Sequence, residues 1–158
     1  MAEQVNMRHV RTEEQRKLYE RIQGDRVCSF CEDFCRGKSP VYHPNPILME
    51  NAHWAFTESF PKYAGAEKHF LIVSKFLDAD GKHALFPVFS GEVWSALGEI
   101  VEWVVAEYRL PAGGFFFRFG DTDFTGASIS HLHAHLIFGG EKSGEALRVK
   151  LGYTGATK

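Results

Sequence analysis

The sequence has no long hydrophobic run and almost no net charge. Across its 158 residues, no apolar stretch reaches the roughly 20 residues that a membrane-spanning helix needs. The N-terminus lacks the apolar core of a signal peptide. The 18 lysines and arginines nearly balance the 20 acidic residues, which gives a formal net charge of -2. Neither a membrane nor a nucleic acid is therefore an expected partner, and an anionic substrate must be attracted by a local site.

Cysteine is scarce as well, with Cys28, Cys31 and Cys35 as its three residues. An odd number, with two cysteines only three positions apart, favours free thiols or metal binding in a reducing compartment, so we expect the cytoplasm. Cys28 and Cys31 form a Cys-x-x-Cys pair, which can be redox-active or can supply half of a zinc site. The thioredoxin-like pattern of a redox pair is not evident, and zinc needs two more ligands from elsewhere. We interpret Cys35 as a bystander.

The remaining composition, 44% hydrophobic and 24% charged, is that of one ordinary globular domain. Hydrophobic periodicity and turn residues predict helices at 13–23 and 93–108, and strands at 47–50, 53–57, 69–75 and 114–119, with a further possible strand at 147–153. The first helix opens with a capping box at Thr12–Gln15, and its charged residues are interpreted as a solvated face. The consecutive aromatic residues of 114–119 predict a strand that is packed on both faces.

The most informative stretch is 131–137, where His131, His133 and His135 alternate with apolar residues. This is the period of a half-buried strand, so the three imidazoles share one face. A single histidine in a strand is usually structural, but three on one face indicate a site. Two chemistries fit: the rings ligate zinc with one open position, or one ring is a nucleophile that its neighbours orient. The small, hydroxylated residues at 120–128 offer backbone N–H groups and hydroxyls that can bind phosphate oxygens.

Residues 131–137 resemble the signature of the histidine triad (HIT) family, His-φ-His-φ-His-φ-φ, in which φ is apolar. Three more segments are similar to that family in order and spacing: Cys28–Cys31, 69–75 and Gly126–Ser128. Segment 118–137 most resembles bacterial members related to diadenosine polyphosphate hydrolases and phosphorylases. The resemblance implies an α+β fold with a five-stranded antiparallel sheet and packed helices. Its implied organisation is an N-terminal helix and extension at 1–24, a HIT domain at 25–140 and a C-terminal tail at 141–158.

The resemblance also implies an enzyme, a hydrolase or nucleotidyl transferase that acts at the α-phosphate of a dinucleoside polyphosphate or a nucleoside phosphoramidate. His133 takes the place of the nucleophile and forms a nucleotidyl-histidine intermediate, His135 helps to bind the phosphate, and Ser128 lies near the leaving group. With a pKa near 6.5, most imidazole is neutral at pH 7 and keeps the lone pair that attack requires. Arg118 is a candidate cation if it faces the site. The residues expected to bind substrate are Gly126, Ala127, Ser128, His135, Phe56 and Phe60, with the two phenylalanines around the base.

In zinc-containing HIT proteins, the first triad histidine is a ligand together with the two cysteines, which implies Cys28, Cys31 and His131 here. The family often has its fourth ligand two residues after the lysine that ends the central strand, where this chain has Leu77. An insertion in the following loop gives that role to His83, with His69 as the alternative. Such a zinc site is closed and structural. The resemblance is also compatible with a homodimer. Two other hypotheses stay open: a catalytic metal held by all three triad histidines, and a nucleotide-binding module with little catalysis.

Overall fold

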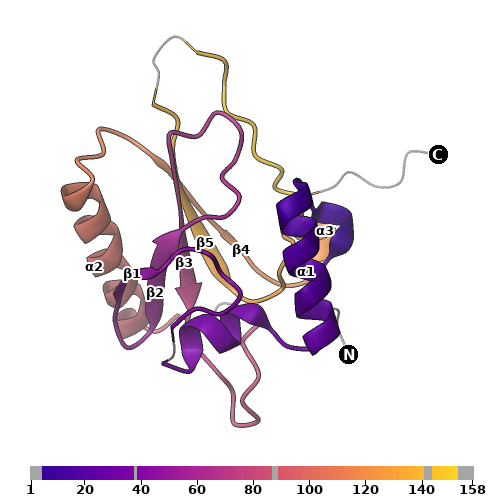
Figure 1. The fold of residues 1–158 in the computed structure, drawn as a ribbon. Coiled ribbons are helices and arrows are strands. Elements are labelled where there is room, and N and C mark those ends of the chain that lie inside the picture. Colours follow the sequence, from indigo (N-terminus) through magenta and orange to yellow (C-terminus); the bar gives the residue numbers. More distant parts are fainter. Residues whose placement is uncertain (1–4, 38, 87–88, 141–143, 153–158) are drawn as a thin grey trace.

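The computed structural model describes residues 5–37, 39–86, 89–140 and 144–152. Its centre is a five-stranded antiparallel sheet in the order β1-β2-β3-β5-β4 (Figure 1). The strands are β1 (Ile47–Glu50), β2 (Trp54–Glu58), β3 (Lys68–Ser74), β4 (Gly114–Arg118) and β5 (His133–Phe138). The helices are α1 (Glu13–Asp25), α2 (Gly91–Glu107) and α3 (Thr122–Thr125), with short turns η1 (Met7–His9) and η2 (Cys31–Cys35). The predicted fold class is confirmed.

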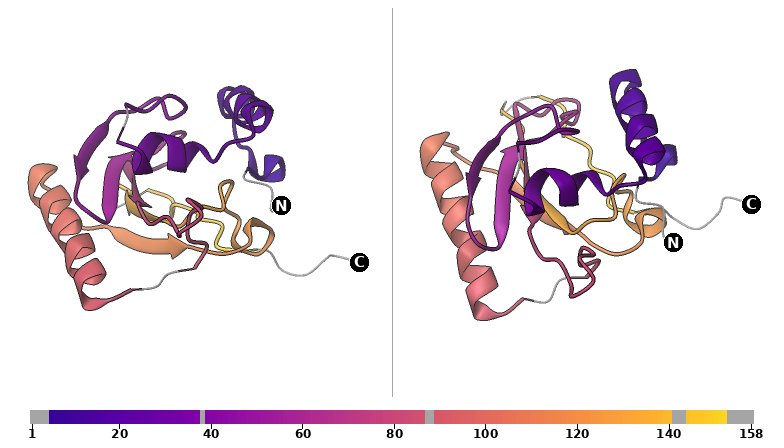
Figure 2. Two further views of the ribbon diagram at one scale, coloured as in Figure 1. Left: turned by 90° about the horizontal axis from the view of Figure 1, so that it is seen from below. Right: turned by 60° about the horizontal axis from the view of Figure 1, so that its bottom comes forward.

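Helix α2 covers one face of the sheet and buries the larger hydrophobic core (Figures 1 and 2). Its stripe of Leu97, Ile100 and Val104 packs onto alternate residues of the strands and of the segment just before β5: Trp54, Phe56, Phe70, Ile72, Leu132, Ala134 and Leu136. Because successive side chains of a strand point to opposite faces, His133 and His135 project from the other face.

A second core lies on that other face, under α1 and η2. Ala55, Leu71 and Val73 of the sheet belong to it, together with N-terminal side chains that include Tyr19, Ile22, Phe30 and Phe34. In both views of Figure 2, α1 and η2 lie on the opposite side of the sheet from α2. The N-terminal part of the chain therefore covers the face that carries the histidines.

Helix α1 begins as predicted, because Thr12 Oγ1 accepts the N–H of Gln15 at 3.1 Å. The helix continues past its predicted end, through Gly24, and closes at Arg26, whose φ is 55°. The second predicted helix is also confirmed, and Ser90 caps it by accepting the N–H of Val93. Within the described residues, no helix combines the length and the apolar character needed to cross a membrane.

The segment before α1 is tied to the loop that precedes the triad. The side-chain amide of Asn6 donates to Thr122 Oγ1 at 3.1 Å and to Asp123 Oδ1 at 2.7 Å. One turn further, His9 Nδ1 lies 2.6 Å from the carbonyl oxygen of Ala127. These contacts join two segments that are more than one hundred residues apart in the sequence.

The strand predictions are wrong in three places. β4 lies at the edge of the sheet and is not packed on both faces, since Phe115 exposes 40% of its surface. Residues 147–152 form no strand, and Tyr153 lies outside the described residues. The strand of the triad starts at His133, so His131 precedes it.

Candidate active site

His133 is held in one tautomer by the backbone. Its strand, β5, is paired on both sides, with β3 and β4, and its side chain is only 5% exposed. Nδ1 of His133 lies 2.6 Å from the carbonyl oxygen of His131. Because a carbonyl only accepts hydrogen bonds, Nδ1 carries the ring proton and Nε2 keeps a lone pair. Burial lowers the pKa of His133 to about 4, so the ring is neutral at pH 7.

His135 is oriented by two hydrogen bonds in series that begin at the backbone. The N–H of Tyr63 donates to Nδ1 of His69 at 3.1 Å, so the proton of the neutral His69 ring lies on Nε2. That Nε2 lies 2.8 Å from Nδ1 of His135 and donates to it. Burial lowers the pKa of both rings, to about 3 for His69, so His135 is also neutral and carries its proton on Nε2. Among the described residues, His135 Nε2 is buried without a hydrogen-bond partner. It is therefore a fixed donor available to a ligand.

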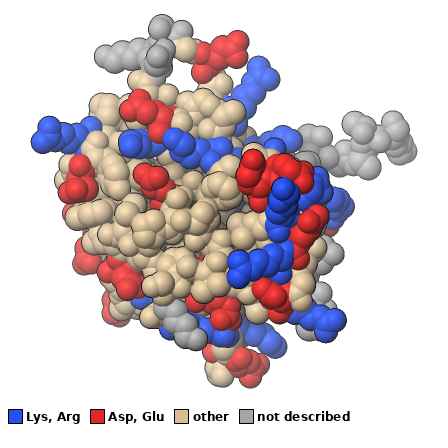
Figure 3. Space-filling view, in the orientation of Figure 1, with Lys and Arg blue, Asp and Glu red and all other residues tan. Residues whose placement is uncertain are grey.

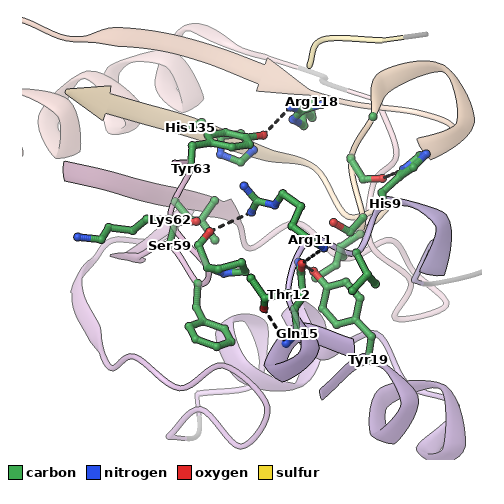
Figure 4. Close-up of a pocket in the computed structure, with 18 of the residues that line it drawn as sticks. His9, Arg11, Thr12, Gln15, Tyr19, Ser59, Lys62, Tyr63, Arg118 and His135 are labelled. Carbon is green, nitrogen blue, oxygen red and sulfur yellow. Dashed lines mark hydrogen bonds between the residues drawn. The ribbon is translucent and has the colours of Figure 1, made fainter. Parts of the chain in front are cut away.

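A cavity of about 730 Å³ lies beside these two histidines. Its walls come from the N-terminal segment and α1, the loop 59–64, the loop before the triad, and 145–150 (Figure 4). This volume is within the range of small-molecule sites. All but one of the predicted catalytic and substrate-binding residues line the cavity, namely Phe60, Gly126, Ala127, Ser128, His133 and His135.

The loop before the triad lines the cavity with the Ser128 side chain, but the backbone N–H groups of Gly126 and Ala127 are not free to bind a ligand. The N–H of Gly126 bonds to the carbonyl of Thr122 at 3.1 Å, and the N–H of Ala127 lies 3.3 Å from Thr125 Oγ1. These two N–H groups are thus already used within the turn. The expectation that they bind phosphate is corrected accordingly, whereas Ser128 remains placed at the cavity wall.

The prediction that Phe56 contacts a nucleobase is wrong. Phe56 is 0% exposed and lies on the α2 face, where its ring centroid is 4.9 Å from that of Phe70 and 5.8 Å from that of Trp103. The alternation of β2 turns its aromatic residues toward α2 and Ala55 toward the histidine face. Phe60 follows the strand and reaches the cavity wall.

Two residues that shape the cavity, Arg11 and Tyr63, were not predicted from the sequence. The guanidinium carbon of Arg11 lies 4.3 Å from the centre of the Tyr63 ring, and Nη2 donates to the Pro61 carbonyl at 2.9 Å. Arg118 lines the same cavity and is 3% exposed. It therefore faces the site, as a candidate cation for the substrate must. No local signal marks Arg11, because it lies just before a helix whose charged residues have the pattern of a solvated face.

Cys28, Cys31, His83 and His131 form a second cluster, with ligand atoms within 4.8 Å of one another. Cys31 Sγ lies 3.3 Å from His83 Nδ1 and 3.4 Å from His131 Nδ1. Cys28 Sγ lies 3.5 Å from His131 Nδ1. Around a tetrahedral zinc ion with bonds of about 2.0–2.3 Å, neighbouring ligand atoms are ~3.3–3.8 Å apart. Nε2 of His131 donates to the carbonyl of Ser74 at 2.7 Å, so the Nδ1 lone pair of the neutral ring faces the cysteines. The two thiols and two imidazoles are a donor set that Zn²⁺ prefers, and these three spacings lie in the range for a shared ion.

The cluster also shows whether His83 or His69 lies beside the cysteines, and whether the three triad histidines point to one metal position. His69 is not in it, because its two ring nitrogens are engaged with Tyr63 and His135. Within the described residues, this is the one group of three or more potential metal ligands. The triad therefore does not converge on a common metal position: His131 faces the cysteines, whereas His133 and His135 face the cavity.

No protein-family model and no curated protein sequence matches this chain. Its fold, however, is similar to solved structures of HIT proteins. A HIT family hydrolase from Clostridium thermocellum aligns over 74% of this chain and 93% of its own, with 19% identity and a TM-score of 0.52. A HIT family hydrolase from Legionella pneumophila aligns over 74% and 96%, with 18% identity and a TM-score of 0.51. A histidine triad protein from Clostridium difficile aligns over 74% and 93%, with 17% identity and a TM-score of 0.50. The chain thus has the HIT fold.

Proposed function

We propose that this chain is a nucleotide hydrolase or nucleotidyl transferase in which His133 attacks the α-phosphorus of a dinucleoside polyphosphate or a nucleoside phosphoramidate. The observation that carries the proposal is the 2.6 Å contact between His133 Nδ1 and the His131 carbonyl, because it leaves an unprotonated Nε2 in a residue that lines the cavity. The description of two structures of similar fold as HIT family hydrolases favours the same class.

The reaction takes two steps. In the first, the Nε2 lone pair of His133 forms an N–P bond, and the bond from phosphorus to the leaving atom breaks with its electron pair. A phosphate leaves as an anion, whereas an amine also takes a proton from solvent. In the second, the oxygen of water or of phosphate attacks the same phosphorus, the N–P bond breaks, and its electron pair returns to Nε2. An attacking water releases its proton to solvent. Between the steps, the His131 carbonyl stabilises the charged ring through Nδ1–H.

Other cavity residues hold the substrate in this scheme. The Nε2–H of His135 is aimed at a non-bridging oxygen of the α-phosphate, where negative charge increases during attack. The hydroxyl of Ser128 lies near the leaving group. Leu18, Ile22 and Phe60 give the same cavity apolar surface for a nucleoside. This combination of one fixed donor, a hydroxyl and apolar walls is typical of small-molecule sites.

We further propose that Cys28, Cys31, His83 and His131 hold a structural Zn²⁺. When bound, a closed four-ligand zinc cross-links separate segments of the chain and supplies folding free energy. His131 is the connection to catalysis, because its side chain is a ligand and its carbonyl orients His133. Free thiols of this kind suit a reducing compartment, and the cytoplasm is the proposed location.

A homodimer through β4 is also proposed. No described strand pairs with the outer edge of β4, and an open edge is a template for pairing with another chain. Phe115 on this strand is 40% exposed, and Trp94 of α2, 49% exposed, packs near it against Phe117. Sedimentation should show a dimer that Phe115→Glu dissociates, and a monomeric wild-type protein would contradict the proposal.

The test of the function replaces His133 by Ala and measures release of nucleoside monophosphate from both substrate classes. Turnover should fall by at least ~10⁴-fold, with the zinc content unchanged. His53→Ala is the matched control, because His53 stacks on Phe76 and does not line the cavity. Loss of metal from the His133 variant would favour a catalytic metal instead. Nucleotide binding without turnover in the wild-type protein would favour a binding module.

A further inference from the structure

The cavity carries more positive charge than one α-phosphate requires. Elsewhere on the face seen in Figure 3, basic and acidic side chains are interspersed around α1, with no continuous field of one sign. The cavity itself has a single acidic lining residue, Glu145, against six basic ones: Arg8, Arg11, Lys62, Arg118, Arg148 and Lys150. From the arrangement of Arg11 and Arg118, we infer that the leaving group of the substrate carries a further phosphate, which these two guanidinium groups bind together. This inference rests on the proposed function and selects the polyphosphate class over the phosphoramidate class.

Arg118 is a buried cation whose partners are all neutral. It is 3% exposed and donates to the carbonyls of Thr125 and Lys150 and to the hydroxyl of Tyr63. No carboxylate among the described residues lies within ion-pair distance of its guanidinium. Buried charges in proteins are normally paired, because transfer from water is costly. The planar guanidinium is also the group best suited to bind a phosphate with two hydrogen bonds.

Arg11 reaches the same place from the opposite wall (Figure 4). Its guanidinium lies over the Tyr63 ring and donates to the Pro61 carbonyl. In the described part of the chain, it too has no carboxylate within ion-pair distance. Burial and the charge of Arg118 both act to lower the pKa of Arg11. Like Arg118, this cation lacks a counter-charge among the residues that the structure describes.

Tyr63 joins both arginines to the catalytic histidines. Its ring lies under Arg11, its hydroxyl accepts from Arg118, and its N–H begins the hydrogen bonds that lead to His135. At the end of that series, the buried Nε2–H of His135 has no partner among the described residues. Two cations without a counter-charge among the described residues and one unpartnered N–H donor thus lie around one tyrosine in one cavity. The unpartnered donor of His135, beside two cations that lack a counter-charge, favours an anionic ligand in this cavity.

The charge of the leaving group distinguishes the two substrate classes. Two neighbouring cations repel each other, and an anion with more than one charge offsets that repulsion best. The α-phosphate in a phosphoramidate carries one negative charge, and its amine leaving group carries none. A polyphosphate chain adds at least one negative charge for each further phosphate. A nucleoside or dinucleoside polyphosphate therefore matches His135 at the α-phosphate and the two arginines at the next phosphate.

The experiment compares kcat/KM for two substrates of the same nucleoside, a dinucleoside tetraphosphate and a phosphoramidate with an uncharged aromatic amine. Arg11→Gln should lower kcat/KM for the tetraphosphate by about 10- to 100-fold, the value of a hydrogen bond to a charged group, and by less than about threefold for the phosphoramidate. Arg11→Lys keeps the positive charge but not the planar guanidinium, so its kcat/KM for the tetraphosphate should lie between those of the wild-type protein and Arg11→Gln. Arg16→Gln is the control, because Arg16 is exposed on α1, pairs with Glu13 and does not line the cavity. It should leave both values unchanged. Equal losses for both substrates, in a variant with an unchanged unfolding midpoint, would overturn the inference.

Binding separates failure of this inference from failure of the proposed function. In the His133→Ala variant, we expect a nucleoside triphosphate to bind about 10- to 100-fold more tightly than the monophosphate. Adding Arg11→Gln should abolish that preference. If the wild-type protein turns over neither substrate but the preference holds, the proposed function fails and the two-arginine phosphate site stands. Turnover without any preference for the longer phosphate chain would contradict the phosphate site alone.

Discussion

Replacing His69 by Phe removes the link between Tyr63 and His135 while it preserves ring packing. His69 is 1% exposed, and its ring stacks on that of Tyr63 with centroids 4.7 Å apart and planes 8° apart. The substitution leaves the Tyr63 N–H without its acceptor, which costs about 1–3 kcal/mol of unfolding free energy. It also releases the His135 ring to the other tautomer, in which Nε2 presents a lone pair to the phosphate. Loss of a hydrogen bond to a charged group, about 1.5–3 kcal/mol, should lower kcat/KM about 10- to 100-fold.

Three measurements check this prediction: kcat/KM for nucleotide release, the free energy of unfolding in urea, and the nitrogen-15 chemical shifts of the His135 ring. His53→Phe is the matched control, because His53 also stacks on an aromatic ring but lies outside the cavity. That variant should change kcat/KM by no more than about twofold. The reasoning is refuted if the folded His69→Phe protein retains wild-type kcat/KM, or if the His135 proton stays on Nε2.

Three further predictions concern stability. Asp33 is 0% exposed and accepts the N–H groups of Val41 and His43, each at 2.7 Å. Asp33→Ala should therefore lower the free energy of unfolding, measured in urea, by about 3 kcal/mol. An unchanged free energy would contradict this. Metal removal by a chelator, or Cys31→Ser, should lower the thermal midpoint together with the zinc content, whereas Cys35→Ser should preserve that content. Because burial lowers the pKa of His69 to about 3 and of His133 to about 4, the unfolded chain binds more protons below pH ~6.5. Stability should therefore fall from pH ~6.5 toward pH ~4, by up to about 1.4 kcal/mol per pH unit for each histidine, and a flat profile would contradict those pKa values.

The sheet and the triad could be predicted because their signals are local. Alternation marks β5, the capping box marks the start of α1, and a stripe of period 3.6 marks α2. The choice of His83 as the residue beside the cysteines depended on resemblance to a family pattern with an insertion, and the geometry brings it to the cluster. A histidine row on one strand face indicated a site without deciding its chemistry. The contact between His133 Nδ1 and the His131 carbonyl indicates the chemistry, because it leaves the lone pair on Nε2.

The residues that were missed or misplaced depend on contacts far apart in the sequence. Arg11 and Tyr63 meet across more than fifty positions, and neither has a local pattern that distinguishes it from a surface residue. The resemblance predicts Phe56 beside the nucleobase, but in the structure this residue packs on the α2 face of the sheet. The aromatic run of β4 predicted two packed faces, and only the strand order shows that it is an edge.

In the proposed mechanism, Nε2 of His133 forms a covalent bond to phosphorus, and this bond can be trapped. Wild-type protein is mixed with a dinucleoside polyphosphate, quenched without acid within the first turnover, and analysed by intact mass and peptide mapping. We expect one added nucleotidyl group per chain, attached to residue 133 through Nε2 and missing from His133→Ala. Turnover without any adduct at early times, or an adduct on a different residue, would contradict it.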